Sequence, residues 1–167
     1  CARAPSTSVL VRVAATYVAV TGRVPSADCI ACVAGTYAES AGNVDVSACI
    51  ECIAGRYSTV VGSSRESNCT ECVAGKYVET SGNNASSDCI DCVAGKYVHV
   101  PGSDNATDCI DCVVGRYVDV AGSDAVSDCI ECVAGKYVNV TGSASASACI
   151  ACAAGKYVES SGNDAAS

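Results

Sequence analysis

The apolar residues of this chain follow a short pattern that returns every twenty residues. In each copy a Tyr opens a Tyr-Val-x-Val segment, as at Tyr117–Val120, and a Gly follows it. Aromatic and β-branched residues bounded by Gly are typical of a short strand. We expect the two valines on one face of that strand, Tyr117 and Asp119 on the other, and a turn at Gly122-Ser123. Each copy is therefore predicted to be a loose two-stranded loop, and nothing in the pattern has a helical period.

A loop of this size is too small to be stable alone, and a fixed period of this length indicates an array of stacked modules. The same period is kept by Tyr17 to Tyr157, by two Gly series and by Cys-x-x-Cys pairs. The seven pairs are Cys29/Cys32, Cys49/Cys52, Cys69/Cys72, Cys89/Cys92, Cys109/Cys112, Cys129/Cys132 and Cys149/Cys152. The predicted fold is a set of small disulfide-rich tandem repeats with short β-strands, which form an elongated rod without helices or a single globular core.

The repeats divide the chain into two regions. Residues 1–28 form a degenerate copy, in which Val9 and Arg12 stand where the cysteines should be, while Tyr17 is kept. Terminal repeats are often atypical, so we expect this region to be an N-terminal cap. Residues 29–167 hold seven repeats, which start at Cys29, Cys49, Cys69, Cys89, Cys109, Cys129 and Cys149. The last repeat is expected to be left unclosed, because its closing Cys would fall beyond Ser167.

Composition places these repeats outside the cell. The chain has no Phe, Met or Trp, so a thick core cannot offset the chain entropy. Its 15 cysteines make up about 9% of the residues, the range of disulfide scaffolds, which persist in oxidising compartments. A net charge of −8 without a basic patch argues against nucleic acid. No apolar run approaches the roughly 20 residues that span a bilayer, so no membrane segment is expected.

Cys-x-x-Cys pairs also occur in zinc sites and in thiol-exchange enzymes. A zinc site would use two pairs, which leaves one of the seven without a partner and singles out no pairing. Thiol exchange needs a thiolate activated by a helix N-terminus or a cation, and no such helix is predicted. No catalytic constellation surrounds the only His, His99. We therefore expect structural disulfides, no cofactor, no metal and no enzyme activity.

Spacing alone does not fix which cysteines are joined. A bridge within each Cys-x-x-Cys is short and usually strained, whereas a bridge from the second Cys of one pair to the first of the next encloses one repeat body. The second arrangement closes loops of 18 residues, each worth roughly 3 kcal/mol in the chain-entropy account. It joins Cys32–Cys49, Cys52–Cys69, Cys72–Cys89, Cys92–Cys109, Cys112–Cys129 and Cys132–Cys149.

The segment from Cys72 through Gly75 and Tyr77 to Cys89 resembles the tumour necrosis factor receptor and ephrin-receptor-like cysteine-rich repeats of extracellular surface proteins. Those modules open Cys-x-x-Gly-x-Tyr and close on the Cys that begins the next Cys-x-x-Cys. The resemblance covers residues 29–167 and implies that the opening Cys of each repeat bonds the closing one. Such repeats occur in receptors, adhesins and large surface proteins, so the resemblance does not choose among those functions.

Six such bridges leave Cys1, Cys29 and Cys152 over. An odd number of cysteines means that at least one thiol is free or bonded between chains. One hypothesis joins Cys152 to Cys1 of a following subunit, a head-to-tail contact that generates an open filament. In the other, Cys1 bonds Cys29 and caps the degenerate repeat.

Two further features accompany the repeats. Basic residues directly after the first Gly and acidic residues between the paired cysteines form either a ladder of opposite charges or two separately solvated series. Four sequons predict N-glycosylation at Asn68, Asn84, Asn105 and Asn139. The sequence therefore favours a structural extracellular protein, the building block of a glycosylated filament or cell-surface appendage. The alternative is the stalk or ligand-binding ectodomain of a cysteine-rich surface receptor or adhesin.

Overall fold

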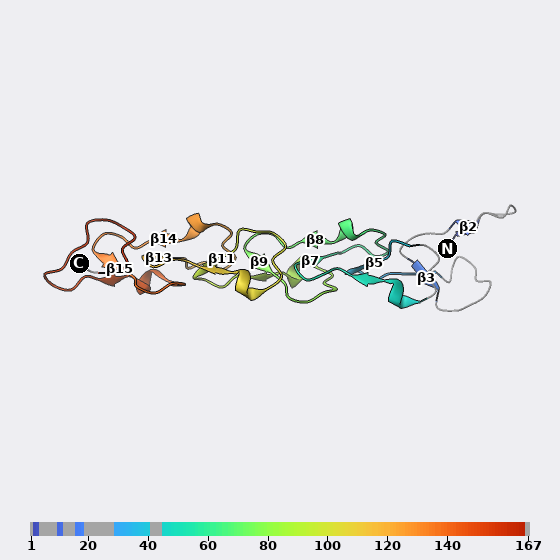
Figure 1. Cartoon of the computed structure of the whole chain (residues 1–167), viewed down its shortest axis with the longest axis horizontal. Helices are drawn as coiled ribbons and strands as arrows, with labels where there is room; N and C mark the ends of the chain where they lie inside the picture. Colours follow the sequence, from blue (N-terminus) through green and yellow to red (C-terminus); the bar gives the residue numbers. More distant parts are fainter. Residues whose placement is uncertain (1, 4–9, 12–15, 19–28, 41–44, 166–167) are drawn as a thin grey trace. The chain divides into compact units, whose positions relative to one another are not determined.

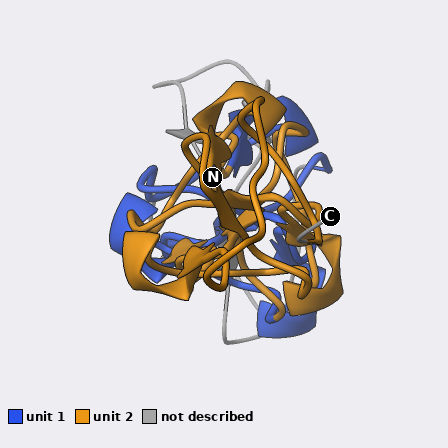
Figure 2. Ribbon diagram, turned by 90° about the vertical axis from the view of Figure 1, so that its left-hand side faces the viewer, with its two compact units in different colours: residues 1–71, 80–88 blue, residues 72–79, 89–167 orange. Residues whose placement is uncertain are grey.

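The computed structural model describes residues 2–3, 10–11, 16–18, 29–40 and 45–165. The chain divides into two units (Figure 2). Unit 1 consists of residues 1–71 and 80–88, and unit 2 consists of residues 72–79 and 89–167. Each repeated feature below lies within one unit. In unit 1, β1 (Ala2–Arg3) also pairs with β2 (Leu10–Val11).

A short antiparallel hairpin recurs along the chain and alternates with single 3-10 turns (Figure 1). In a typical hairpin a basic residue lies opposite an acidic residue of the next repeat, and the Tyr lies opposite an Ile. Lys96↔Asp111 and Tyr97↔Ile110 are an example. Tyr17↔Ile30 keeps this register in the degenerate first copy. The hairpins are β3 (Thr16–Val18) with β4 (Cys29–Ala31), β5 (Thr36–Tyr37) with β6 (Ile50–Glu51), β7 (Arg56–Tyr57) with β8 (Thr70–Glu71), β9 (Lys76–Tyr77) with β10 (Ile90–Asp91), β11 (Lys96–Tyr97) with β12 (Ile110–Asp111), β13 (Arg116–Tyr117) with β14 (Ile130–Glu131), and β15 (Lys136–Tyr137) with β16 (Ile150–Ala151).

The position of the first strand differs from the prediction. We expected it to run through Tyr-Val-x-Val, but β13 ends at Tyr117, and the valines do not share a face: Val118 is 3% exposed and Val120 is 63% exposed. The reason is that the N–H of Val118 donates to the carbonyl of Ser143 at 3.0 Å, so the backbone leaves the hairpin to bond a later repeat. A contact between repeats thus overrides the local strand propensity.

The described residues contain no α-helix, as predicted, but a single 3-10 turn stands before the first Cys of each pair from Cys49/Cys52 to Cys149/Cys152. In η5 the Asp108 carboxylate accepts the backbone N–H groups of Asp104 and Asn105, both at 3.1 Å, which satisfies donors at the start of the turn. The turns are η2 (Val46–Ala48), η3 (Glu66–Asn68), η4 (Ser86–Asp88), η5 (Ala106–Asp108), η6 (Val126–Asp128) and η7 (Ala146–Ala148). Within unit 2, η5, η6 and η7 project to different sides, seen in orange in Figure 2.

Each repeat has a small core built on its disulfide. In unit 2, Cys112, Val118 and Cys129 form one buried cluster, against which Tyr97 of the preceding repeat packs. The same arrangement recurs one repeat earlier with Tyr77 and one repeat later with Tyr117. The apolar side chains are thus buried in a series of separate clusters, which agrees with the expected lack of one shared core.

Backbone contacts join each repeat of unit 2 to the next and to the next but one. The N–H of Gly95 donates to the carbonyl of Val118 in the following repeat at 2.8 Å. A Cβ on Gly95 would lie 2.1 Å from the carbonyl oxygen of Gly142, two repeats further on. Gly75 meets Gly122 and Gly115 meets Gly162 in the same way. Gly is therefore required here both by a φ of 91° at Gly95 and by the close approach of another backbone.

The chain contains its own control for this contact. Gly95 and Gly135 share a positive φ, but nothing lies within 4 Å of a Cβ on Gly135. We predict that Gly95→Ala and Gly135→Ala both carry the left-handed penalty of roughly 1–2 kcal/mol. Gly95→Ala should cost about 1–3 kcal/mol more because the added methyl overpacks the contact with Gly142. Denaturant unfolding of the oxidised variants measures the difference. Equal losses of unfolding free energy would contradict the close contact between Gly95 and Gly142, which we call the interlock.

Candidate functional site

The disulfides form the most regular chemical feature of the chain. The structure joins Cys32–Cys49, Cys52–Cys69, Cys72–Cys89, Cys92–Cys109, Cys112–Cys129 and Cys132–Cys149, with Cα–Cα distances of 5.6–5.8 Å. These are the pairs that the family resemblance implies. Each bridge runs from the Cys before a tight turn to the Cys that ends a 3-10 turn.

Local structure brings the two cysteines of a bridge together. Cys109 follows η5, and its N–H donates to the carbonyl of Ala106 at 3.3 Å. Cys112 lies three residues later, where its N–H donates to the carbonyl of Gly95 at 2.9 Å. Each Cys-x-x-Cys is therefore a junction that closes one repeat with its first Cys and opens the next with its second.

The bridged cysteines are buried except Cys49, which is half-buried. The opening cysteines of the bridges are 0–1% exposed. No group of three or more His, Cys, Asp or Glu side chains in the described residues could hold a metal ion. These cysteines therefore act as cross-links in the structure.

Cys152 is the one described cysteine without a bridge, and it is half-buried. It occupies the opening position of the last repeat, equivalent to Cys132, whose sulfur is bonded to Cys149. Cys1 and the side chain of Cys29 lie outside the described residues. The predicted pairing of the three remaining cysteines is therefore still a prediction.

Four basic residues of one charge series pair with acidic residues of the other across the hairpins. Lys96 Nζ lies 2.8 Å from Asp111 Oδ1, and Arg116 Nη2 lies 2.7 Å from Glu131 Oε1, in each case between residues directly opposite in the register. Arg56–Glu71 and Lys76–Asp91 pair in the same way. Of the two interpretations of the charge pattern, the structure has the ladder, whose exposed pairs each contribute roughly 0–1 kcal/mol.

The acidic member of one pair also contacts a later repeat. The hydroxyl of Ser161 donates to the Glu131 carboxylate, and with Arg116 it lowers the pKa of Glu131. Ser81 makes the equivalent bond to Glu51 in unit 1. Glu131 thus bonds both the preceding repeat, through Arg116, and the following repeat, through Ser161. Sequence reasoning did not detect the second contact because Ser161 lies thirty residues away.

The four sequons have different surroundings. Asn84, Asn105 and Asn139 are exposed. Asn105 begins η5, and its Oδ1 accepts from the backbone N–H and hydroxyl of Thr107 at 2.9 and 2.7 Å. Asn68 is half-buried, and its Nδ2 donates to Ser63 Oγ at 2.8 Å. Asn68 therefore differs from the other three sequon residues in being less exposed and in having its side-chain amide hydrogen-bonded to Ser63.

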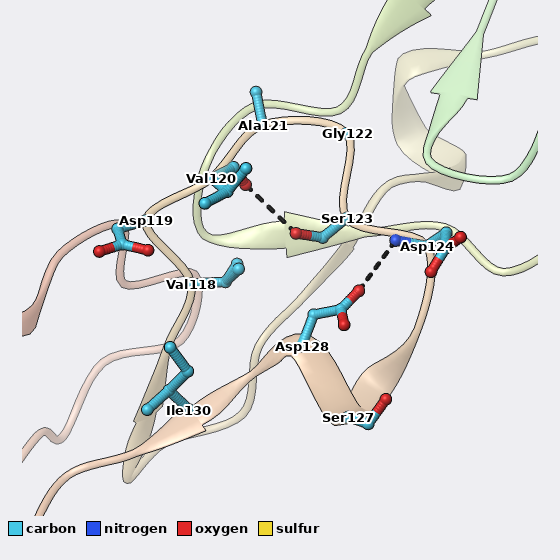
Figure 3. Close-up of a pocket in the computed structure, with 10 residues that line it drawn as sticks. All are labelled: Val118, Asp119, Val120, Ala121, Gly122, Ser123, Asp124, Ser127, Asp128 and Ile130. Carbon is cyan, nitrogen blue, oxygen red and sulfur yellow. Dashed lines mark hydrogen bonds between the residues drawn. The ribbon is translucent and has the colours of Figure 1, made fainter.

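The loop of the repeat that starts at Cys109 surrounds a shallow depression of about 490 Å³ (Figure 3). Val118, Val120 and Ile130 supply its aliphatic lining, and Asp119 lies at its rim. The loop is held by two bonds, from Ser123 Oγ to the carbonyl of Val120 at 3.2 Å and from the N–H of Asp124 to Asp128 Oδ2 at 3.0 Å.

The same depression recurs one repeat earlier, over Val98 to Ile110, with His99 in place of Asp119. His99 is therefore a rim residue, as expected for a surface position. The sequence analysis missed the depression because it exists only once the loop has closed. Its only sequence signal is an acidic residue directly before the first Cys, as at Asp108 and Asp128.

A family model described as tyrosine-protein kinase ephrin type A/B receptor-like matches residues 21–69 and 75–129. The chain belongs to this family. The match confirms the ephrin-receptor-like resemblance, and the family's repeats are of the cysteine-rich extracellular type. No curated protein matches the chain. Among the described residues, no helix is long and apolar enough to cross a membrane.

We predict that Ser161→Ala raises the pKa of Glu131 because it removes a donor to the carboxylate. A carboxyl group with a lowered folded-state pKa stabilises the fold above its unfolded pKa, and this contribution is lost as the pH falls through the folded value. The variant should therefore lose less stability on acidification. Carboxyl-detected NMR titration measures the shift. Ser160→Ala is the control, and an unchanged Glu131 titration in Ser161→Ala would contradict the contact.

Proposed function

We propose that this chain is a structural protein of the cell exterior, the building block of a glycosylated filament or surface appendage, without a catalytic role. The observation that carries the proposal is the interlock between repeats. Gly75–Gly122, Gly95–Gly142 and Gly115–Gly162 are the same contact three times. Because this contact is made by backbone atoms, any further copy of the repeat can make it. An array of this kind can be extended without a new interface being evolved for each addition.

Gly135 and Gly155 lack the close backbone contact that Gly95 and Gly115 make. Nothing lies within 4 Å of a Cβ at either residue. Gly135 and its neighbours Ala134 and Lys136 are exposed, whereas Gly115, the equivalent of Gly135 one repeat earlier, is buried. Cys152 lies in the same repeat as Gly155. Head-to-tail self-association, in which Cys152 bonds Cys1 of the following copy, is part of this proposal.

The second candidate is a stalk or ligand-binding ectodomain. The depression in Figure 3 favours it, because an aliphatic lining with a polar rim is the usual composition of a binding surface. Membership of a receptor-like family also supports this role. The depression recurs on successive repeats, so a ligand would contact the array along its side.

Electron microscopy and non-reducing gels of purified chain separate the two roles. The filament proposal predicts filaments, together with a ladder of covalent oligomers that collapses to a monomer with reductant. Cys152→Ser should abolish the ladder. Ser147→Ala is the control and should leave it unchanged. Dispersed monomers without reductant would overturn covalent head-to-tail assembly, and monomers that bind a partner through the loops would favour the ectodomain.

Glycan attachment is expected at the exposed sequons. We predict that Asn84→Gln, Asn105→Gln and Asn139→Gln each remove the mass of one N-linked glycan from secreted protein. Asn68→Gln should remove none, because Asn68 is half-buried and bonded to Ser63. Intact-mass spectrometry before and after enzymatic deglycosylation measures occupancy. A secreted chain without any glycan at these four residues would contradict the glycosylated coat.

A further inference from the structure

The connectivity of the disulfides creates a continuous covalent route that bypasses most of each repeat. A route that enters at Cys92 crosses its bridge to Cys109, follows Ile110 and Asp111 to Cys112, and crosses the next bridge to Cys129. The same step recurs from Cys32 to Cys149. The sixteen residues between two bridged cysteines, whose sequence separation is 17, lie beside this route and not on it.

The route sets how far the chain can lengthen. An extended chain spans at most ~3.5 Å per residue, so a repeat without its bridge reaches about 70 Å. With the bridge, the route consists of a Cα–Cα step of 5.7 Å and three residue steps, or about 16 Å per repeat. Even a repeat whose hydrogen bonds have all broken is therefore held to about a quarter of its free length.

We propose that the chain is a tension-bearing tether, in which the disulfides and the two-residue junctions between them carry the load. This inference rests on the proposed structural role and adds what that role requires, a fixed length under pulling. The covalent route bypasses the loops, so the depression in Figure 3 and the exposed sequons lie off the load-bearing chain.

The non-covalent structure reinforces the loaded route. At one junction the N–H of Cys112 bonds Gly95, and Asp111 pairs with Lys96 at 2.8 Å. These contacts tie the two-residue junction to the preceding repeat. The bridge that follows is buried, with Cys112 at 0% and Cys129 at 3% exposure, so a reductant reaches it only after the repeat opens. The covalent route therefore limits how far the chain can lengthen, and the burial of this bridge limits its reduction.

Reduction is the reaction that releases the length. A thiolate of dithiothreitol attacks one bridge sulfur, breaks the S–S bond and forms a mixed disulfide, while the other sulfur leaves as a thiolate. The second dithiothreitol thiolate then displaces the protein sulfur, which leaves two cysteine thiols and one cyclic oxidised dithiothreitol. Each bridge lost frees a contour length of about 54 Å, the 17 residue steps less the Cα–Cα distance.

Single-molecule force spectroscopy on the full chain, held at residues 31 and 150 so that the unbridged ends bear no load, tests the tether. The oxidised chain should stretch without any gain of about 54 Å, and dithiothreitol should then release up to six such steps, one for each bridge. Steps of this size in the oxidised chain would overturn the proposal, since they would mean that bridges do not carry the load. So would bridges within each Cys-x-x-Cys, because these would leave the loop residues on the loaded route.

Two variants locate the effect within the chain. The double variant Cys112→Ser with Cys129→Ser should gain one step of about 54 Å without reductant, even if its own repeat fails to fold, because the other bridges report independently. Cys152→Ser lies outside the bridged route and should gain none. A double variant that stretches like the parent would overturn the load path. Filament formation by microscopy is a separate measurement, so a chain that forms no filaments but shows the step pattern would contradict the proposed function alone.

Discussion

The disulfide that closes each repeat is the constraint on which the rest of the structure depends. A repeat buries little besides its bridge, the Val that packs on it and the Tyr of the preceding repeat. One bridge contributes roughly 3 kcal/mol by restricting the unfolded chain. Ordering a residue costs about 1–2 kcal/mol in backbone entropy, so twenty residues cost about ten times what the bridge supplies. The bridge therefore positions the repeat, and contacts with other repeats supply most of the remaining stabilisation.

Those contacts reach further than in a simple stack. In a solenoid each repeat usually contacts only its neighbours, and stability is a sum of repeat and nearest-neighbour contributions. Here Gly95 meets Val118 in the next repeat and Gly142 in the one after it. Three consecutive repeats must be in place before this Gly is fully packed. Folding of the array is accordingly cooperative over at least three repeats, so the small cluster of one repeat does not have to stabilise that repeat alone.

The sequence predicted the features that lie within one repeat and missed those made between repeats. Period, hairpins and turns at Gly follow from residue types at fixed spacing, and the bridges are those that the family resemblance implies. The strand position was wrong because Val118 bonds Ser143, twenty-five residues later, and local propensity carries no information about that partner. Likewise, the Gly before each Tyr was expected only to allow a tight turn. Its second role depends on which backbone lies against it in three dimensions.

The division between constant and variable positions bears on the choice between the two functions. Cys, Gly and Tyr recur because they make the bridges, the interlock and the clusters. The rim of the loop depression changes from His99 to Asp119, while Asn139 holds the same place in the next repeat. A ligand that bound each repeat alike would need the same chemistry at each rim. The chain instead keeps what holds repeats together and varies what faces outward, which is expected where the array itself, and not a repeated binding site, is the functional unit.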